Sequence, residues 1–442
     1  MINYMISLTD EDMMKEEPIS LFSPANPIPT ETIFLSNIDQ AVTFPVETLF
    51  FYAAAGTADV AAMVRTAVER VLLVPYYFMA GRLRWSGDAQ RLELVCNNSG
   101  VLFVSARTRV SLDDLGDLSN PNADFSRFVH RPGLYKSFED TPIFTIQVTR
   151  FECGAFALGF MTNHAILDGK SASEMFHNLA SICRGEGLKT VWVDNDRTPL
   201  KARTPPQIHF PHNEYLELSK TLSQPSSFTS QKRMSPSPLI FSNNYVHKLF
   251  AFSNETLAKL KNKTLAKCST FEAILAHIWR ARTRAYFDNL DQESTVLFAV
   301  DIRDKITPPL PEAFAGNAVI TAFARARARD LIGRPLWFGV ERVREGVERV
   351  TNEYIRSVID WLEVHKGIPA TGNGGAFYVS AWWKLTFGEV DLGFGWPQHA
   401  GPIVSGNDEF VLFLDDGNSG INVWLGLDKD KMDNFSSCVY QM

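Results

Sequence analysis

A long stretch without helical or strand periodicity divides this chain into two nearly equal halves. Residues 194–238, of 442 in the chain, contain seven prolines and a serine-rich run. A loop of this length is uncommon inside one compact domain, and the chain is longer than one hydrophobic core usually serves. We therefore expect two domains, residues 1–195 and 239–442, joined by a crossover loop over residues 196–238.

Both halves alternate between strand and helix patterns. In the first half, the continuous apolar run 156–161 predicts a buried strand, and apolar spacing predicts helices over 60–72 and 171–184, the latter with Ser171 as N-cap. Further strands are expected over 91–95, 101–104 and 144–148. This alternation indicates an α/β or α+β fold.

The second half continues the alternation. Ser269 and Glu272 match the capping box and predict the start of a helix, and Ser253 leads into another. Periodic apolar residues over 335–364 predict one long helix. Strands are expected at five places: 245–252, 296–300, 377–381, 410–413 and 421–427.

Composition is that of a soluble globular protein, with 45% hydrophobic and 21% charged residues. A net charge of -7 argues against a nucleic-acid binder, which normally has a basic face. The five cysteines lie far apart without paired spacing, which favours reduced thiols and neither disulfides nor a zinc site. We expect no bound metal.

No targeting or membrane-spanning segment is expected. Residues 1–17 are acidic, unlike a signal or transit peptide. The best apolar run, 48–58, is about half the ~20 residues that a membrane helix needs. The expectation is a cytoplasmic monomer.

His164 is the strongest candidate for chemistry. It follows the predicted strand 156–161 and precedes a helix, so a rigid element delivers it to a cleft, where a general base is useful. Gly169 suits a turn with an unusual backbone angle, and Asp168 either orients the imidazole or holds the turn by a salt bridge. His277, in a predicted helix, and His399, in a predicted loop, are expected to be structural.

Two distant motifs give this chain a specific resemblance. Residues 163–169, NHAILDG, fit the HxxxDG motif, and residues 391–397, DLGFGWP, look like the DFGWG motif, of the plant BAHD acyl-CoA-dependent acyltransferases. Five further segments agree with that family: 35–39, 80–83, 269–273, 300–303 and 316–317. Within the family, the chain is most similar to transferases that place hydroxycinnamoyl groups on fatty alcohols or ω-hydroxy fatty acids.

The resemblance implies an architecture. Two α/β domains of the chloramphenicol acetyltransferase type, with mixed sheets, would enclose a channel. His164 would lie mid-channel, with acyl-CoA entering from one face and the acceptor from the other. A segment near residues 370–386 would return to the sheet of the first domain. Acyl-CoA would be a co-substrate, with no permanently bound cofactor.

The resemblance also implies roles for individual residues. His164 would act as general base, and the oxyanion would be stabilised by Ser380 and Trp382, whose hydroxyl and indole N–H groups are both competent donors. Asp168 would face away from the substrate and pair with Arg303. Asp168, Arg303 and Gly169 would therefore have structural roles. A nucleophilic serine is not required, and no GxSxG elbow is present.

The second motif is expected to form a structural turn near the CoA channel through Asp391, Gly393 and Gly395. The chain departs from the family pattern at Leu392 and Phe394. Both substitutions keep apolar bulk, so the turn should survive, whereas the detailed geometry of the CoA loop is put in doubt.

Lys248 and Ser253, near the strand after the crossover, are candidates to bind the CoA phosphates. The partners expected are therefore acyl-CoA and a small-molecule alcohol or amine.

Three classes of function stay open from the sequence. The leading one is an acyl-CoA-dependent O- or N-acyltransferase of plant specialised metabolism. The second is a lyase or hydrolase that uses His164 without CoA, which the altered DLGFG turn keeps open. The third is a non-catalytic, acyltransferase-like binding protein. Condensation domains of peptide synthetases share HxxxDG but usually carry a second His where this chain has Asn163.

Overall fold

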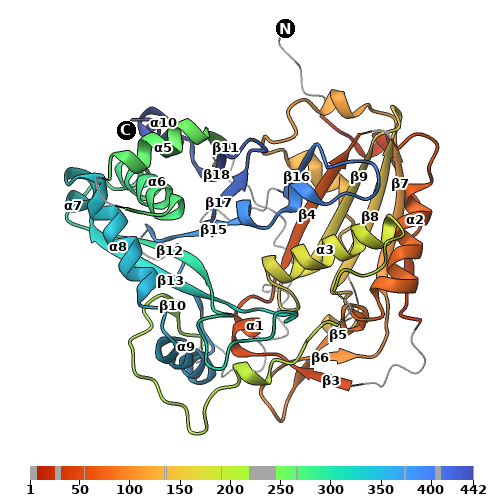
Figure 1. The fold of residues 1–442 in the computed structure, drawn as a ribbon, viewed down its shortest axis with the longest axis horizontal. Helices are drawn as coiled ribbons and strands as arrows, with labels where there is room; N and C mark the ends of the chain where they lie inside the picture. The colour runs from red at the N-terminus through yellow and green to blue at the C-terminus, as the bar shows by residue number, and fades with distance from the viewer. Residues whose placement is uncertain are drawn as a thin grey trace.

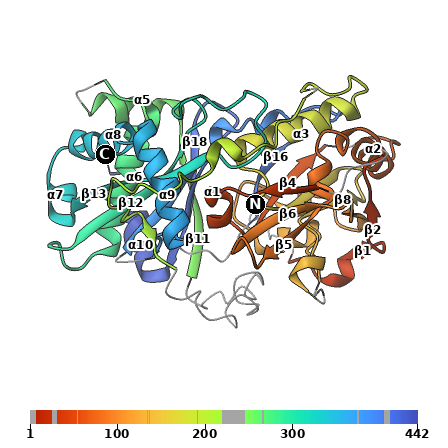
Figure 2. The same ribbon diagram turned by 90° about the horizontal axis from the view of Figure 1, so that it is seen from below.

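The chain forms two α/β halves that lie side by side (Figure 1), and the view from below separates them clearly (Figure 2). Both main sheets contain parallel and antiparallel pairs, which confirms the predicted α/β class with mixed sheets. The computed structural model describes residues 7–24, 31–53, 55–133, 135, 137–190, 192–218, 245–264, 267–372, 375–403 and 410–441.

The first half is built on a seven-stranded sheet with the order β1-β7-β8-β9-β4-β16, in which β2 also pairs with β7. Its strands are β1 (Met13–Lys15), β2 (Ile19–Leu21), β4 (Pro45–Tyr52), β7 (Val101–Thr108), β8 (Phe144–Phe151), β9 (Phe156–Asn163) and β16 (His399–Pro402). A smaller sheet of order β3-β6-β5 flanks it, with β3 (Glu31–Phe34), β5 (Arg82–Ser86) and β6 (Arg91–Cys96).

Both faces of the seven-stranded sheet are buried, so β9 is buried along its whole length, and its residues 156–161 form a continuous apolar run. Helices α2 (Val60–Ala67) and α3 (Gly169–Cys183) pack on one face with Phe50, Phe160 and Phe176 between them. The segment 110–129 covers the other face. A short helix α1 (Asn37–Ala41) lies between the halves (Figure 1).

The second half is built on a six-stranded sheet of order β11-β18-β17-β15-β12-β13. Its strands are β11 (Tyr245–Phe252), β12 (Glu293–Asp301), β13 (Val319–Arg327), β15 (Phe377–Ala381), β17 (Phe410–Asp415) and β18 (Ile421–Asp428). Two further short strands, β10 (Tyr215–Leu216) and β14 (Ile368–Pro369), pair with each other.

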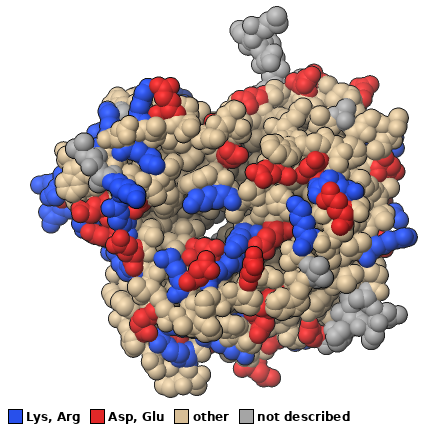
Figure 3. Space-filling view, in the orientation of Figure 1, with Lys and Arg blue, Asp and Glu red and all other residues tan. Residues whose placement is uncertain are grey.

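Helices cover one face of this second sheet and leave the other toward the first half (Figure 1). The helices of this half are α5 (Asn254–Asn262), α6 (Thr270–Tyr286), α7 (Ala328–Gly333), α8 (Leu336–Glu348), α9 (Asn352–His365) and α10 (Lys429–Cys438). The capping box predicted at Ser269 is present and begins α6. In the space-filling view, the surface is hollowed between the halves, with charged side chains around the opening (Figure 3).

The segment that crosses back to the first sheet is not the one predicted. Residues 370–386 were expected to return there, but β15 pairs with β12 and β17 in the second sheet. The crossing strand is β16, in which His399, predicted to lie in a loop, pairs with Phe51 of β4. Residues 377–381 are a short apolar strand, which suits a central position, whereas β16 is an edge strand whose Ala, Gly and Pro residues give little strand signal.

Two predicted helices differ from the structure. The helix expected over 335–364 is two helices, because the chain leaves helical geometry after α8 and the Thr351 hydroxyl caps the start of α9. The helix expected over 60–72 changes from α to π geometry at Val68. The apolar spacing continues across the break between α8 and α9 and across the change of geometry at Val68, so periodicity alone does not reveal either one.

The described part of the crossover, residues 196–218, is fastened to the second half. Arg203 pairs with Asp360 of α9 at 2.6 Å. His212 is buried and bonds to Ser357 and Glu214 at 2.9 Å each. The rest of the predicted crossover lies outside the described residues. None of the helices described is long and apolar enough to cross a membrane.

Candidate active site

His164 is held in a fixed turn at the end of β9. The Asn163 side chain accepts a hydrogen bond from the Ala165 N–H at 3.0 Å, a local contact that makes Asn favourable in turns. The His164 N–H donates to the Phe44 carbonyl at 2.8 Å, and the Phe44 ring lies 5.3 Å from the imidazole. The side chain is half-buried, so a ligand can reach it.

Asn317 determines which ring nitrogen of His164 carries the proton. Its Nδ2 donates to the His164 carbonyl at 2.8 Å and to Asp39 Oδ1 at 2.7 Å, which uses both amide hydrogens. This pair of acceptors fixes the orientation of the amide. Its Oδ1 therefore accepts, at 3.0 Å, a hydrogen bond from His164 Nδ1. The proton sits on Nδ1, and Nε2 keeps the lone pair of a base.

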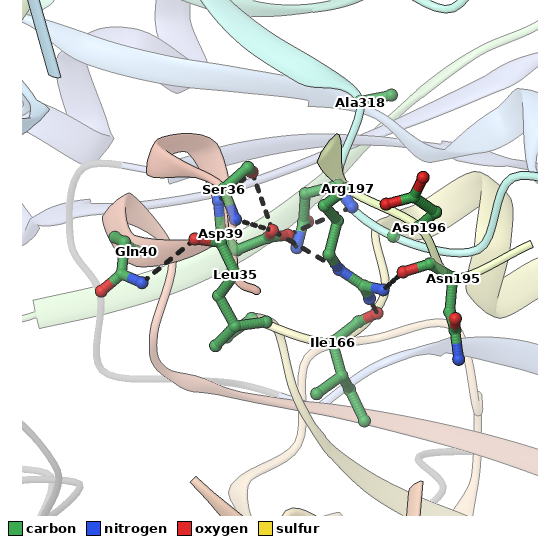
Figure 4. Close-up of polar contacts among 12 residues, drawn as sticks. Leu35, Ser36, Asp39, Gln40, Ile166, Asn195, Asp196, Arg197 and Ala318 are labelled. Atoms are coloured by element: carbon green, nitrogen blue, oxygen red, sulfur yellow. Dashed lines mark hydrogen bonds and ion pairs between the residues drawn. The ribbon is translucent and has the colours of Figure 1, made fainter. Parts of the chain in front are cut away.

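A buried ion pair stands behind Asn317. Figure 4 shows Ser36 and Arg197 reaching the Asp39 carboxylate from different sides. Asp39 accepts from the Ser36 hydroxyl and N–H at 2.7 Å each, and Arg197 Nε lies 3.5 Å away, with both charged side chains fully buried. Arg197 also donates to the carbonyls of Ile166, at 3.0 Å, and Asn195. The turn after His164, helix α1 and the crossover are thus joined.

The surroundings keep His164 neutral. Burial lowers its pKa below the ordinary 6.5, and this outweighs the nearby groups that raise it, among them Asp168 and Asn317. A neutral imidazole with a free Nε2 can accept a proton from an alcohol or amine that attacks a carbonyl.

Asp168 faces away from the imidazole and joins the two halves. Its carboxylate pairs with Arg303 at 2.9 Å and accepts from the N–H groups of Ser171, at 2.9 Å, and Ala318, at 3.0 Å. Burial raises the pKa of Asp168, but Arg303 and these hydrogen bonds outweigh it, so the pKa lies below its ordinary value. The pairing expected of Asp168 and Arg303 is present.

Helix α3 begins earlier than predicted, and for a different reason. Asp168 is its N-cap, whereas Ser171, the predicted cap, lies inside the first turn. Gly169 has no positive φ, contrary to the unusual angle expected. Its lack of a side chain is needed because a Cβ would lie 2.8 Å from the Leu385 side chain.

Ser380 belongs to the face of the second sheet that looks away from the covering helices. Phe377 and Val379 point into the helix-covered core. Side chains alternate along a strand, so Ser380 and Tyr378 point to the opposite face, toward the first half.

Trp382 follows in a short 3-10 helix, Trp382–Lys384, and links the two halves. Its ring packs edge-on against Phe387, 5.5 Å away, within the first half's core. Leu385 then touches Gly169, five residues after His164. This brings Trp382 close to the turn of His164, although no hydrogen bond joins these two side chains among the described residues.

The DLGFG segment forms the tight turn predicted. Asp391 Oδ1 accepts from the N–H groups of Gly393, at 2.7 Å, and Gly395, at 2.9 Å. Both glycines have positive φ, +100° and +86°. Leu392 is buried, and Phe394 packs edge-on against the first sheet. The two departures from the family pattern therefore keep the turn.

Lys248 and Ser253, the candidates for CoA phosphates, have partners within their own half. Lys248 lies on the side of β11 facing α10, where its ammonium donates to Ser436 at 3.2 Å. Ser253 is the N-cap of α5, and its hydroxyl accepts from the Thr256 N–H at 3.2 Å. Both contacts lie within the second half, and CoA binding by Lys248 and Ser253 stays a prediction.

Asp39, Asn317 and Arg197 received no role from the sequence. Ser36 and Asp39 follow the S-x-x-D capping pattern, which predicts a helix start but not a second contact of the same carboxylate. No local sequence pattern indicates that Arg197 reaches this carboxylate, because the two residues lie far apart in the chain.

Comparison with known proteins agrees with the fold. A profile described as the transferase family matches residues 14–442. The chain is 35% identical to "Acyltransferase GLAUCE" of Arabidopsis thaliana, over 97% of this chain and 95% of that protein. It is 34% identical to the "Omega-hydroxypalmitate O-feruloyl transferase" of the same plant, over 98% and 93% of the two chains.

Among solved structures, the fold is similar to TRI101 of F. sporotrichioides, crystallised with coenzyme A and T-2. The TM-score is 0.73 at 15% identity, and the match covers 92% of this chain and 97% of that one. The two-domain architecture predicted from the sequence is thereby confirmed. The chain belongs to the transferase family of BAHD acyltransferases, close to those that act on fatty alcohols and hydroxy fatty acids, and is an acyltransferase enzyme.

Proposed function

We propose that this enzyme transfers an acyl group of the hydroxycinnamoyl type from its CoA thioester to the hydroxyl of a long-chain alcohol, with His164 as the general base. The observation that carries the proposal is the contact of Asn317 with His164 Nδ1, which leaves Nε2 free to take a proton.

The acceptor oxygen attacks the thioester carbonyl while His164 Nε2 removes its proton. No enzyme nucleophile is needed, because the acceptor attacks directly. The imidazolium then returns the proton to the CoA sulfur as the carbon–sulfur bond breaks, which leaves ester and free CoA thiol. A pKa lowered by burial keeps the base unprotonated at the start of this cycle.

Ser380 and Trp382 are our candidates for stabilising the tetrahedral oxyanion. Ser380 points away from the helix-covered core of its sheet, and the segment after Trp382 packs against the helix that His164 precedes. Hydroxyl and indole N–H groups aimed at the developing charge would stabilise the transition state more than the ground state, which lowers the barrier.

The substrate classes come from the relatives. One is an ω-hydroxypalmitate O-feruloyl transferase, and a protein of similar fold was crystallised with coenzyme A. An aromatic acyl-CoA and an alkyl alcohol are therefore the first pair to test, with amines as the second acceptor class. The cytoplasmic location and monomeric state expected from the sequence stay predictions, as do the domain boundaries.

A lyase or hydrolase without CoA is the weaker candidate. The altered DLGFG turn kept it open, but Asp391 still holds both glycine N–H groups. No observation at the turn favours that chemistry.

The test uses purified enzyme with feruloyl-CoA and a panel of alcohols and amines, with free CoA thiol as the readout. We expect acceptor-dependent thiol release, and His164→Ala should reduce kcat by about 10²- to 10⁴-fold, the range of general base catalysis. His209→Ala is the matched control, because His209 is half exposed and pairs with Glu353 on the surface. Its activity should equal that of the wild type.

Thiol release that survives His164→Ala would contradict the role of the base. Release that needs no acceptor would favour a hydrolase. Absence of release with every pair, from protein with a cooperative melting transition, would contradict the proposed transfer itself.

A further inference from the structure

Trp424 of β18 carries a buried polar group that the structure does not satisfy. The residue is 8% exposed, and its indole Nε1–H has no hydrogen-bond partner in the part of the chain that the structure describes. Most buried side-chain donors in proteins are paired, so an unpaired one requires an explanation.

The position of Trp424 in the sheet gives that explanation. Ser380 pairs with Leu412, Leu412 with Trp424, and Trp424 with Leu249, so one row crosses β15, β17, β18 and β11. Residues paired across a sheet point to the same face. The neighbours of Trp424 in sequence, Val423 and Leu425, are in the helix-covered core. Trp424 therefore shares the opposite face with Ser380.

This face is apolar around the indole. Trp424 clusters with Leu412, Leu414 and Trp382, and the His247 ring is 6.0 Å away. Trp382 belongs at the same time to the core of the first half. The cluster thus forms a wall between the two halves, on the side where the oxyanion candidates lie.

The spacing along the row sets a length for a ligand. Ser380 and Trp424 are two strands apart, and neighbouring strands are about 4.8 Å apart, so roughly 10 Å separates them. A substrate with its reacting carbonyl at Ser380 would lie over Leu412 and end at the indole N–H.

We propose that Trp424 donates a hydrogen bond to an oxygen at the far end of a flat or extended apolar substrate group. The inference rests on the proposed function and extends it, because it makes Trp424 a specificity-determining residue. The group bound is a hydrogen-bond acceptor oxygen about two strand spacings from the reacting carbon, and either of two substrate groups can supply it. It is the ring hydroxyl of an aromatic acyl group, or a second oxygen at the end of an alkyl alcohol.

Trp424→Phe tests this, because it removes the N–H and keeps an aromatic ring. In the acyl arm, kcat/KM is compared for para-coumaroyl-CoA and cinnamoyl-CoA, which differ by one hydroxyl, with hexanol as acceptor. In the acceptor arm, hexanol is compared with the terminal hexanediol, with cinnamoyl-CoA as donor. Trp337→Phe, at a tryptophan on the surface of α8 with 39% exposure, is the matched control.

We expect Trp424→Phe to lower kcat/KM about three- to tenfold for the oxygen-bearing member of one pair, the effect of one neutral hydrogen bond, and to leave the other member unchanged. A selective loss in the acyl arm identifies the acyl group as the ligand. A selective loss in the acceptor arm identifies the alcohol as the ligand. Equal losses for both members of each pair, or no loss, would overturn the proposal, since Trp424 would then act by packing alone.

Binding separates this inference from the proposed transfer. In a His164→Ala background, isothermal titration compares the two acyl-CoAs, and then the two alcohols, with and without Trp424→Phe. A selective three- to tenfold rise in Kd would support the role of Trp424 even if no pair reacts. Equal affinities in both backgrounds, or no binding of any of these ligands, would overturn it.

Discussion

Asn317 holds His164 through the ring nitrogen and the backbone carbonyl at once, so removing its side chain should disturb the base without removing it. We predict that Asn317→Ala lowers kcat on the order of 10²-fold, because the ring loses the contact that sets its tautomer and position. KM for the acyl-CoA should stay close to that of the wild type. Steady-state kinetics measure both constants.

A matched variant separates orientation from folding. Asn97→Ala changes an Asn of an exposed turn, where the side chain contacts Ser99, and should leave kcat unchanged. The ¹⁵N chemical shifts of the imidazole report the tautomer directly. An Asn317→Ala enzyme with full kcat, or with Nδ1 still protonated in the same proportion, would contradict the assigned tautomer.

The pH profile follows from the pKa of the same residue. Burial lowers the pKa of His164, so its neutral form persists to lower pH than that of an ordinary His. We predict that the acidic limb of kcat/KM has its midpoint below the ordinary 6.5. Activity should be lost as pH falls through that value, because protonation removes the lone pair. A midpoint above 6.5 would show that the charged neighbours outweigh burial.

The individual residues of the site were not equally predictable. His164 was identified because a buried strand, a turn and a helix are adjacent in the sequence. Asn317 is 153 residues away from it, and the contact depends on how the halves are placed. Asp39 and Arg197 meet for the same reason. Residues that act through long-range contacts leave no local pattern to find.

At the scale of elements, strands were predicted better than helix ends. β11 and β15 begin and end at the residues expected, since both are rich in the aromatic and aliphatic residues that favour strands. Helix ends depend on caps, which are single side chains. Thr351 caps α9 inside a periodic run, and Asp168 caps α3 ahead of the expected Ser171. Periodicity continues through a cap, so it cannot locate one.

The DLGFG turn offers a clean test of backbone conformation. Gly395 has φ of +86°, and a Cβ there would meet no atom within 4 Å. We predict that Gly395→Ala destabilises the protein by about 1–2 kcal/mol, the cost of a left-handed conformation for an ordinary residue. Urea unfolding measures the free energy of unfolding.

The control for this substitution lies on the neighbouring segment. Gly388 has ordinary φ and a single atom near a Cβ, Asp415 Oδ2 at 3.9 Å. Gly388→Ala should change the free energy of unfolding by less than about 0.5 kcal/mol. Equal effects of the two substitutions would contradict a turn that depends on the positive φ.

At the scale of the whole molecule, several kinds of contact join the two halves in addition to the hydrogen bonds of Asn317 with His164 and Asp39. Strand β16 extends the first sheet, Trp382 packs into the first core, and Arg303 pairs with Asp168. The sequence predicted two halves and a returning strand but placed that strand near 370–386. A short edge strand that contains Ala, Gly and Pro carries little sequence signal, and the pairing partner β4 is far away in the chain.

The buried pair of Asp168 and Arg303 should therefore stabilise the joined molecule. We predict that Arg303→Ala lowers the free energy of unfolding by about 3–5 kcal/mol, because it leaves the Asp168 carboxylate buried and unpaired. Arg325→Ala, which breaks a surface pair with Glu293, should cost less than about 1 kcal/mol.

Because the pKa of Asp168 is lowered in the folded state, its contribution to stability is present above the unfolded value of about 3.9 and is lost as pH falls through the folded value. The difference between wild type and Arg303→Ala, measured by urea unfolding, should therefore shrink as the pH is lowered below about 4. A loss no larger than that of Arg325→Ala, or a difference that stays constant with pH, would mean that the halves are held together without this ion pair.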